Sequence, residues 1–320
     1  MCIVYTKYYL ILEKIMTIAV VITLLASLLW AIGNHIDKYM LSNIDDSESN
    51  VKTLLIFSTL IAGLIISPIW LLTSKFQISI SFPSLIAIFL AAILYILATY
   101  FYFKALEKND ASIVIVMFQL IPVFSYILAL IFFKETLEVK EIIGALIIIS
   151  SAILISFDFS KSSNKNKLVA LLLMATSSLL YSLYFTCFDF ATRNSEYNAV
   201  AFWYQIGLLL VGISLINIKG FRNDFLKLIK NKGKMFLSLN ITNEVLNLIA
   251  NLMVNFAVLT IPLALANTLM GFQGAFVFII GVIGTLLFPK IIKEDLDKRS
   301  VIQKIFCIIL AIVGLIVMFN

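Results

Sequence analysis

Apolar windows follow one another along almost the whole chain and are separated by short polar connectors. At about 1.5 Å per residue, a helix of roughly 20 residues matches a hydrocarbon core of about 30 Å. The windows cover residues 17–36, 54–72, 85–103, 112–133, 142–156, 168–190, 200–216, 236–258, 263–287 and 302–319. This pattern predicts an all-α, polytopic membrane protein with about ten transmembrane helices.

The second set of windows repeats features of the first. A polar linker at residues 158–167 separates two sets of five, and SLLW from Ser27 is matched by SLLY from Ser178. FKALEKNDASIVIVM from Phe103 aligns with FAVLTIPLALANTLM from Phe256, after which both sets contain Phe-Gln. Because five is odd, the second set must enter the membrane in the opposite direction. We therefore predict two inverted five-helix repeats at residues 1–157 and 168–320, with residues 1–15 as an extension ahead of the first span.

A stripe of polar side chains runs along one face of the window at residues 236–258. At about 100° per residue, steps of three and four place these side chains on one side of a helix. They are Asn240, Asn243, Glu244, Asn247, Asn251 and Asn255, of which Asn243 lies just outside the main arc. Lipid does not solvate amides, so the stripe must face other helices or a wet cavity. We expect Asn240, Glu244, Asn247, Asn251 and Asn255 to bind substrate; hydrogen bonding between helices is the structural alternative.

Glu244 is, on this interpretation, the one acid deep inside a predicted span. An ionisable group at that depth costs several kcal/mol unless it is paired or hydrated, which makes it a functional candidate. An apolar environment penalises the charged form of a carboxyl, so Glu244 could exchange a proton near neutral pH or meet a substrate amine. A protonated or hydrogen-bonded structural glutamate is the alternative.

Further candidates lie on the other predicted spans. Gln119 and Gln273 occupy matching positions in the fourth helix of each set, and Asn267 shares a helix with Gln273. Each could line a substrate site or bridge helices. A further set could supply an aromatic wall or serve in packing: Tyr95, Tyr181, Tyr184, Trp203, Tyr204 and Gln205. Pro122 is expected to kink its helix near the membrane centre, and His35, at a predicted helix end, is interpreted as hydrated and interfacial.

Composition excludes several classes of protein. The chain is 62% hydrophobic and 13% charged, with a mean hydropathy of +1.05, far from the balance of a soluble domain. The net charge of +6 is dispersed over connectors, so no nucleic-acid partner is expected. The three cysteines suggest neither a disulfide framework nor a metal site, and no nucleotide-binding or nucleophile motif occurs. We therefore predict no cofactor, no metal and no enzymatic activity.

Residues 101–155 resemble the EamA-like branch of the drug/metabolite transporter superfamily. The shared pattern is Ala-Leu closing the third helix, a small residue opening the fourth, a proline within it, an acid after it and a glycine starting the fifth. Here these are Ala105 and Leu106, Ala111, Pro122, Glu135 and Gly144. SLLWAIGNHIDKYML in the first window also resembles the family's opening, and the resemblance extends over nearly the whole chain.

The resemblance implies ten helices in two repeats and movement of a small metabolite, often export of amino acids or related compounds. The second half departs from the pattern, because Gly274 or Ala275 stands where a proline is expected and residues 289–295 replace the simple junction. The leading hypothesis is a secondary transporter, an exporter by preference, in the cell membrane as a monomer or homodimer. Alternatives are a membrane-embedded subunit that handles lipid-linked intermediates and a scaffold without transport.

Two sequence features imply opposite orientations of the chain in the membrane. Connectors after odd-numbered spans hold 18 of the 24 Lys and Arg residues, so the positive-inside rule places both termini outside. The family resemblance implies termini in the cytoplasm.

Overall fold

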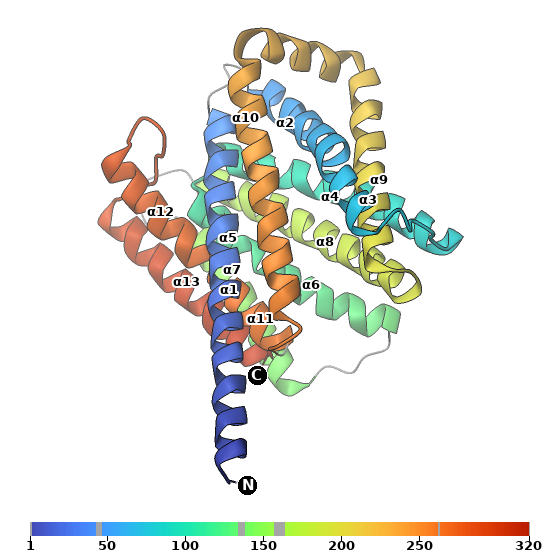
Figure 1. The fold of residues 1–320 in the computed structure, drawn as a ribbon. Coiled ribbons are helices and arrows are strands. Elements are labelled where there is room, and N and C mark those ends of the chain that lie inside the picture. The colour runs from blue at the N-terminus through green and yellow to red at the C-terminus, as the bar shows by residue number, and fades with distance from the viewer. Residues whose placement is uncertain (1, 43–46, 134–137, 157–163, 262, 320) are drawn as a thin grey trace.

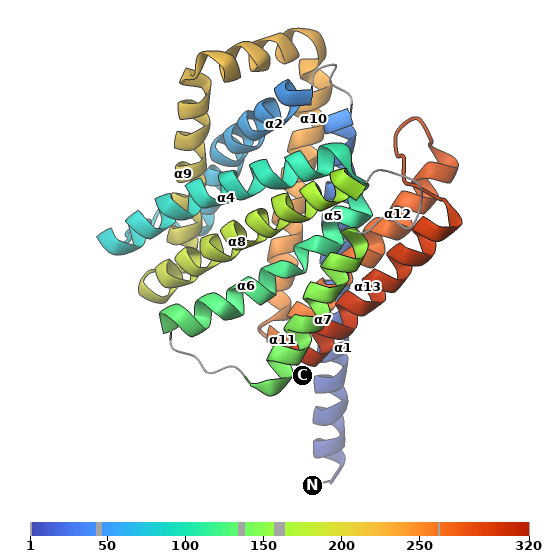
Figure 2. The same cartoon turned by 180° about the vertical axis from the view of Figure 1, so that it is seen from behind.

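The protein is built from helices. In the computed structural model, residues 2–42, 47–133, 138–156, 164–261 and 263–319 are described, and within them every regular element is a helix. The elements are α1 Cys2–Ser42, α2 Ser47–Ile61, η1 Ala62–Ile66, α3 Ser67–Thr73, α4 Phe82–Lys108, α5 Ala111–Phe118, α6 Leu120–Leu128, η2 Ala129–Phe133, α7 Val139–Ser156, α8 Asn164–Asn194, α9 Tyr197–Asn217, α10 Lys219–Ala257, α11 Leu263–Met270, α12 Gln273–Leu287 and α13 Lys298–Phe319. Figures 1 and 2 show them as one bundle.

Within the described ranges, eight helical stretches are long and apolar enough to span a membrane. They are Ile15–Ser42, Val51–Thr73, Phe82–Lys108, Ala111–Phe132, Lys167–Asn194, Tyr197–Asn217, Leu265–Leu287 and Lys298–Phe319. The two other predicted windows are also helical, as α7 and the second part of α10, where the amides of the stripe lower the mean hydropathy. The all-α, polytopic fold class is confirmed.

Two sequence predictions fall partly outside the described residues. Of the polar linker at residues 158–167, residues 158–163 lie outside them and the rest already belong to α8. Glu135 also lies outside.

The first span is longer than its hydropathy predicted. The expected end at Ile36 is wrong, because α1 continues to Ser42. The polar residues Asn34, His35, Asp37 and Lys38 therefore lie inside a helix, and their side chains bond neighbouring helices. The N and C labels both lie toward the lower end of the bundle in Figure 1, as an even number of spans requires.

The fourth span of the first half is broken close to its predicted kink. Pro122 carries no backbone N–H, so the Phe118 carbonyl lacks its helical partner four residues on. The chain responds with a turn at Gln119, whose N–H bonds the Val116 carbonyl at 3.2 Å, between α5 and α6. The break thus precedes the proline that causes it.

The fourth span of the second half is broken at the matching place without a proline. The Phe272 N–H bonds the Leu269 carbonyl at 3.1 Å between α11 and α12. A Cβ on Gly271 would overlap the Leu315 side chain of α13. Glycine therefore permits close approach of α13 at the point where the helix breaks.

The connector between α9 and the second part of α10 is helical, where the sequence analysis expected a polar link. A kink at Lys232 divides α10, and its first part lies across one end of the bundle at the top of Figure 1. This part packs on α2, with the rings of Phe225 and Phe57 at 5.0 Å between centroids. Five cationic side chains of α10, four before the kink and one after it, are exposed: Lys219, Arg222, Lys227, Lys230 and Lys234.

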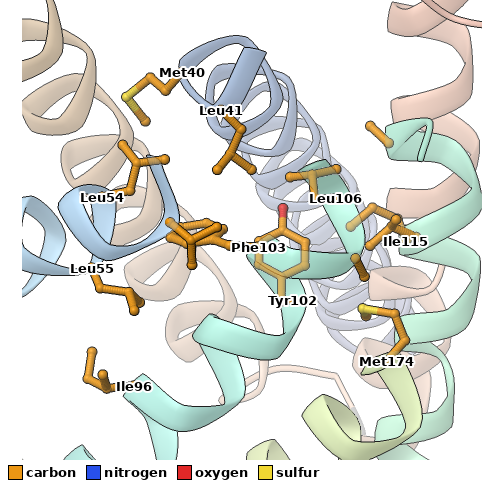
Figure 3. Packing of buried hydrophobic residues seen from close by; sticks show 14 of the residues in the cluster. Met40, Leu41, Leu54, Leu55, Ile96, Tyr102, Phe103, Leu106, Ile115 and Met174 are labelled. Carbon is orange, nitrogen blue, oxygen red and sulfur yellow. The ribbon is translucent and has the colours of Figure 1, made fainter. Parts of the chain in front are cut away.

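Buried apolar side chains join the two halves. In Figure 3, side chains from α1, α2, α4, α5 and α8 converge, including Leu54, Phe103 and Met174. Because lipid is as apolar as these side chains, the helices are held together by close packing and not by the exclusion of water. The α7–α13 contact illustrates this: a Cβ on Gly144 would lie 2.6 Å from the Met318 backbone nitrogen.

Candidate functional site

A continuous chain of hydrogen bonds crosses the bundle from α12 to α10. The Gln273 amide donates to Asn34 Oδ1 at 2.8 Å, and the Asn34 amide donates to the Tyr102 hydroxyl at 2.9 Å. The Tyr102 hydroxyl donates to one oxygen of Asp37 at 3.3 Å, and the Asn243 amide donates to the other at 2.8 Å. Helices α1, α4, α10 and α12 are thereby joined around the Asp37 carboxyl.

The backbone of α1 makes room for this network. Gly33 lies one turn before Asp37, and a Cβ there would come 2.5 Å from Asn243 Oδ1. Glycine therefore allows the Asn243 side chain to pack against α1 and reach Asp37. Asn243 Oδ1 itself is buried without a hydrogen-bond partner among the described residues.

Glu244 follows Asn243 on α10 and lies near the same carboxyl. Glu244 and Asp37 interact electrostatically, and Glu244 also interacts with Tyr95 and Tyr181. Both carboxyl side chains are half-buried although they belong to the interior of the bundle. The prediction that Glu244 is the one acid deep inside a span is wrong, because the extension of α1 places Asp37 inside a span as well.

The polar stripe divides into two environments. Asn240 is buried and donates to Met40 Sδ at 3.3 Å and to the Phe236 carbonyl, while it accepts from Ser58. Asn247 is half-buried. Asn251 and Asn255 are exposed and donate to the Asn247 carbonyl and to the Tyr197 hydroxyl, at 2.8 and 2.9 Å. The upper part of the stripe therefore meets other helices, and the lower part lies at the surface of the bundle.

The remaining candidates lie on the broken helices and on α8. Gln273 is the first residue of α12 and belongs to the network, whereas Gln119 sits half-buried at the matching break. Asn267 is half-buried on α11. The Tyr181 hydroxyl lies 3.0 Å from Thr99 Oγ1, which joins α8 to α4.

Tyrosine rings form a wall beside the two carboxyls. The Tyr95 ring lies 5.6, 5.5 and 6.0 Å, between centroids, from those of Tyr181, Tyr184 and Tyr204. The Tyr181 ring is 5.5 Å from Phe118, which leads back to Tyr102. Helices α4, α8 and α9 supply the tyrosines of this wall, which are among the residues expected from the sequence as a possible aromatic wall.

Two basic residues of α1 are engaged by backbone carbonyls. His35 is buried, with Nε2 2.8 Å from the Val277 carbonyl of α12, so its interpretation as a hydrated interfacial residue is wrong. Lys38 donates to the carbonyls of Leu106, Glu107 and Asn109 at 2.7, 3.1 and 2.9 Å. Lys38 thus closes the C-terminal end of α4, where unpaired helical carbonyls favour a cation.

A second polar cluster joins the halves at the end of α4. Lys304 of α13 donates to Asp110 at 2.6 Å and to Glu294 at 2.8 Å, and Ser112 also bonds Glu294. Burial, reinforced by the nearby Asp110 carboxylate, raises the pKa of Glu294 to about 7, while Lys304 opposes this rise. This cluster ties the start of α5 to the segment between α12 and α13.

Neither cluster has the composition of a metal centre. In the part of the chain that the structure describes, no group of three His, Cys, Asp or Glu side chains could hold a metal ion. The arrangement around Asp37 can instead accept hydrogen bonds and positive charge.

Comparison with known proteins agrees with this architecture. Residues 17–157 match the model of the EamA-like transporter family. Sixteen chains of solved structures match the protein. One, described as "Crystal structure of protein", covers 93% of this chain and 94% of its own, with a TM-score of 0.56 and 14% identity, which shows a shared fold alone. No curated protein matches.

The family match adds a functional class to the bundle of membrane-spanning helices. Members of this family are transporters of small molecules, and the matched region contains Asp37 and the first broken helix. Residues 17–157 are thus similar to the EamA-like transporter family, and the chain is a multi-pass integral membrane protein.

Proposed function

We propose that the protein is a secondary transporter that exports a small polar metabolite, such as an amino acid or a related compound, across the cell membrane. The observation that carries the proposal is the polar network around Asp37, which lies where both halves of the chain have a broken fourth span. Broken helices at corresponding places in two repeats are typical of substrate sites in secondary transporters.

The helix contacts support an internal two-fold relation. Exchanging corresponding spans of the halves pairs α1 with α8, α2 with α9 and α4 with α10. The observed α4–α8 contact then becomes the observed α1–α10 contact, and the α4–α9 contact becomes the α2–α10 contact. The α7–α13 contact maps onto itself. Two repeats related in this way can rock against each other and expose the site to each side in turn.

Proton exchange at Glu244 would couple this movement to a pH gradient. Glu244 accepts no hydrogen bond from the residues that the structure describes, and its nearest electrostatic partner, Asp37, is also acidic. Two neighbouring carboxyls are more readily occupied by a proton or a cationic substrate than left doubly charged. Competition between proton and substrate for this pair provides the coupling.

Flux measurements in liposomes test the proposal. The full chain is reconstituted, an outward or inward pH gradient is imposed, and flux of labelled amino acids and amines is followed. We expect Glu244→Gln to abolish the dependence on the gradient and to leave thermal stability unchanged within a few degrees. Glu196→Gln, at an exposed acid before α9, is the matched control and should behave as the unaltered protein. Gradient-driven flux that persists in Glu244→Gln would remove Glu244 from the coupling step.

A further inference from the structure

We propose that the substrate is an organic cation, an alkylated amine or ammonium compound held between the Asp37–Glu244 pair and the wall of tyrosine rings. This inference rests on the proposed function and narrows its substrate class.

The charged side chains of the site are acidic, and the neighbouring basic residues bond elsewhere. Asp37 and Glu244 interact with each other, and neither has a cationic partner among the described residues. The adjacent cation, Lys38, is held by three carbonyls at the end of α4. His35, the residue after Asn34, is directed at the Val277 carbonyl. A positively charged ligand would therefore supply the charge that the site lacks.

The hydrogen-bonding groups of the site are also unbalanced toward acceptors. One N–H of each side-chain amide of Gln273, Asn34 and Asn243 is used within the network. Asn243 Oδ1 is buried without a hydrogen-bond partner among the described residues, and the Glu244 carboxyl interacts there with Asp37 and not with a donor. A substrate carboxylate would find acceptors already facing it, whereas an ammonium N–H would find acceptors that need a donor.

The aromatic wall is suited to the apolar part of such a ligand. Tyr95 interacts electrostatically with both carboxyls, and its ring meets those of Tyr181, Tyr184 and Tyr204 at 5.5 to 6.0 Å between centroids. Faces of aromatic rings attract ammonium groups within about 6 Å, most strongly where water is displaced. The carboxyls and the neighbouring rings together favour a cation with alkyl substituents.

A series of probes that differ in charge tests the inference. Thermal unfolding of the full chain in detergent is followed with 1-butanol, butyrate, 4-aminobutyrate, butylammonium and diethylammonium. We expect the two cations to raise the melting temperature, and the neutral and anionic compounds to leave it unchanged. Stabilisation by butyrate or butanol equal to that by butylammonium, or no stabilisation by either cation, overturns the inference.

Substitutions at the proposed site test where the cations bind. Asp37→Asn and Glu244→Gln should each weaken the apparent affinity for the cations by roughly tenfold or more, since each removes one side of a charge pair. Tyr95→Phe should keep the affinity and Tyr95→Leu should lose it, because the proposed contact with the ligand is made by the aromatic ring. Glu196→Gln should have no effect. Cation affinity that survives loss of both carboxyls overturns the inference.

Flux measurements distinguish a failure of this inference from a failure of the proposed function. Gradient-driven movement of a neutral or anionic metabolite, abolished by Glu244→Gln, would keep the transporter and overturn the cationic substrate. Tight binding of cations without any flux would keep the site and overturn transport.

Discussion

Replacing Lys304 with methionine removes the cation that joins the halves of the chain at the end of α4. The Lys304 and Glu294 side chains are 2% and 1% exposed, and the ammonium group makes bonds of 2.6 and 2.8 Å to Asp110 and Glu294. Loss of one partner of a buried ion pair costs roughly 3–5 kcal/mol, because the other charge stays buried without compensation. We expect a loss of this size in the free energy of unfolding.

The pH dependence of the loss follows from Glu294. Burial raises the pKa of this carboxyl to about 7, and Lys304 opposes the rise. A carboxyl with a raised folded-state pKa stabilises the fold when protonated, and this contribution disappears as the pH rises through that value. Without Lys304 the pKa of Glu294 rises further. The loss should therefore be larger at about pH 8 than at about pH 5.

Equilibrium unfolding of the two proteins at both pH values measures this effect. Lys304→Met combined with Glu294→Gln removes both charges of the Lys304–Glu294 pair and should regain part of the lost stability at the higher pH. A loss under about 1 kcal/mol, typical of an exposed ion pair, or a loss that is equal at both pH values would refute the reasoning.

Three further substitutions test the packing and the broken helix. Gly144→Leu should lower folded yield and melting temperature, because a Cβ would lie 2.6 Å from the backbone nitrogen of Met318. Gly274→Ala is the matched control: no atom lies within 4 Å of its new Cβ, so it should be neutral or slightly stabilising in thermal unfolding. Pro122→Ala restores an N–H for the Phe118 carbonyl and should straighten the fourth span; we expect reduced flux with retained thermal stability, and unchanged flux would show that the break is dispensable.

The spans could be predicted because length and hydropathy are local properties that the bilayer fixes. The end of the first span could not, since polar residues after Ile36 look like a helix end when their partners are unknown. Asp37 stays in the helix because Tyr102 and Asn243 bond it, and Asn243 lies 206 positions away in the chain. A hydropathy profile assigns such residues to a loop, whereas in the folded bundle they form a polar site.

The polar stripe shows the same limit within one helix. Its helical period correctly placed the amides on one face, but the neighbours of that face change along its length. Asn240 packs against α1 and α2, whereas Asn255 meets Tyr197 at the surface. Asn243, just outside the main arc, has the closest bond to Asp37. Angle on a helical wheel therefore identifies the face and leaves the depth of each side chain undetermined.

The cluster at Lys304 had no detectable sequence signal. Asp110 and Lys304 are 194 residues apart, and each lies close to a predicted span end, where charged residues are common. Only the folded arrangement of the α12–α13 segment against α5 brings them together.

Flux of a labelled organic cation through liposomes that contain the full chain tests the central claim most directly. The claim is that Asp37 and Glu244 form the site at which substrate and proton exchange. It predicts gradient-driven flux in the unaltered protein and in Glu196→Gln, with no gradient-driven flux in Asp37→Asn or Glu244→Gln, although both variants unfold at nearly the same temperature as the unaltered protein. Equal gradient-driven flux in all four proteins would contradict it.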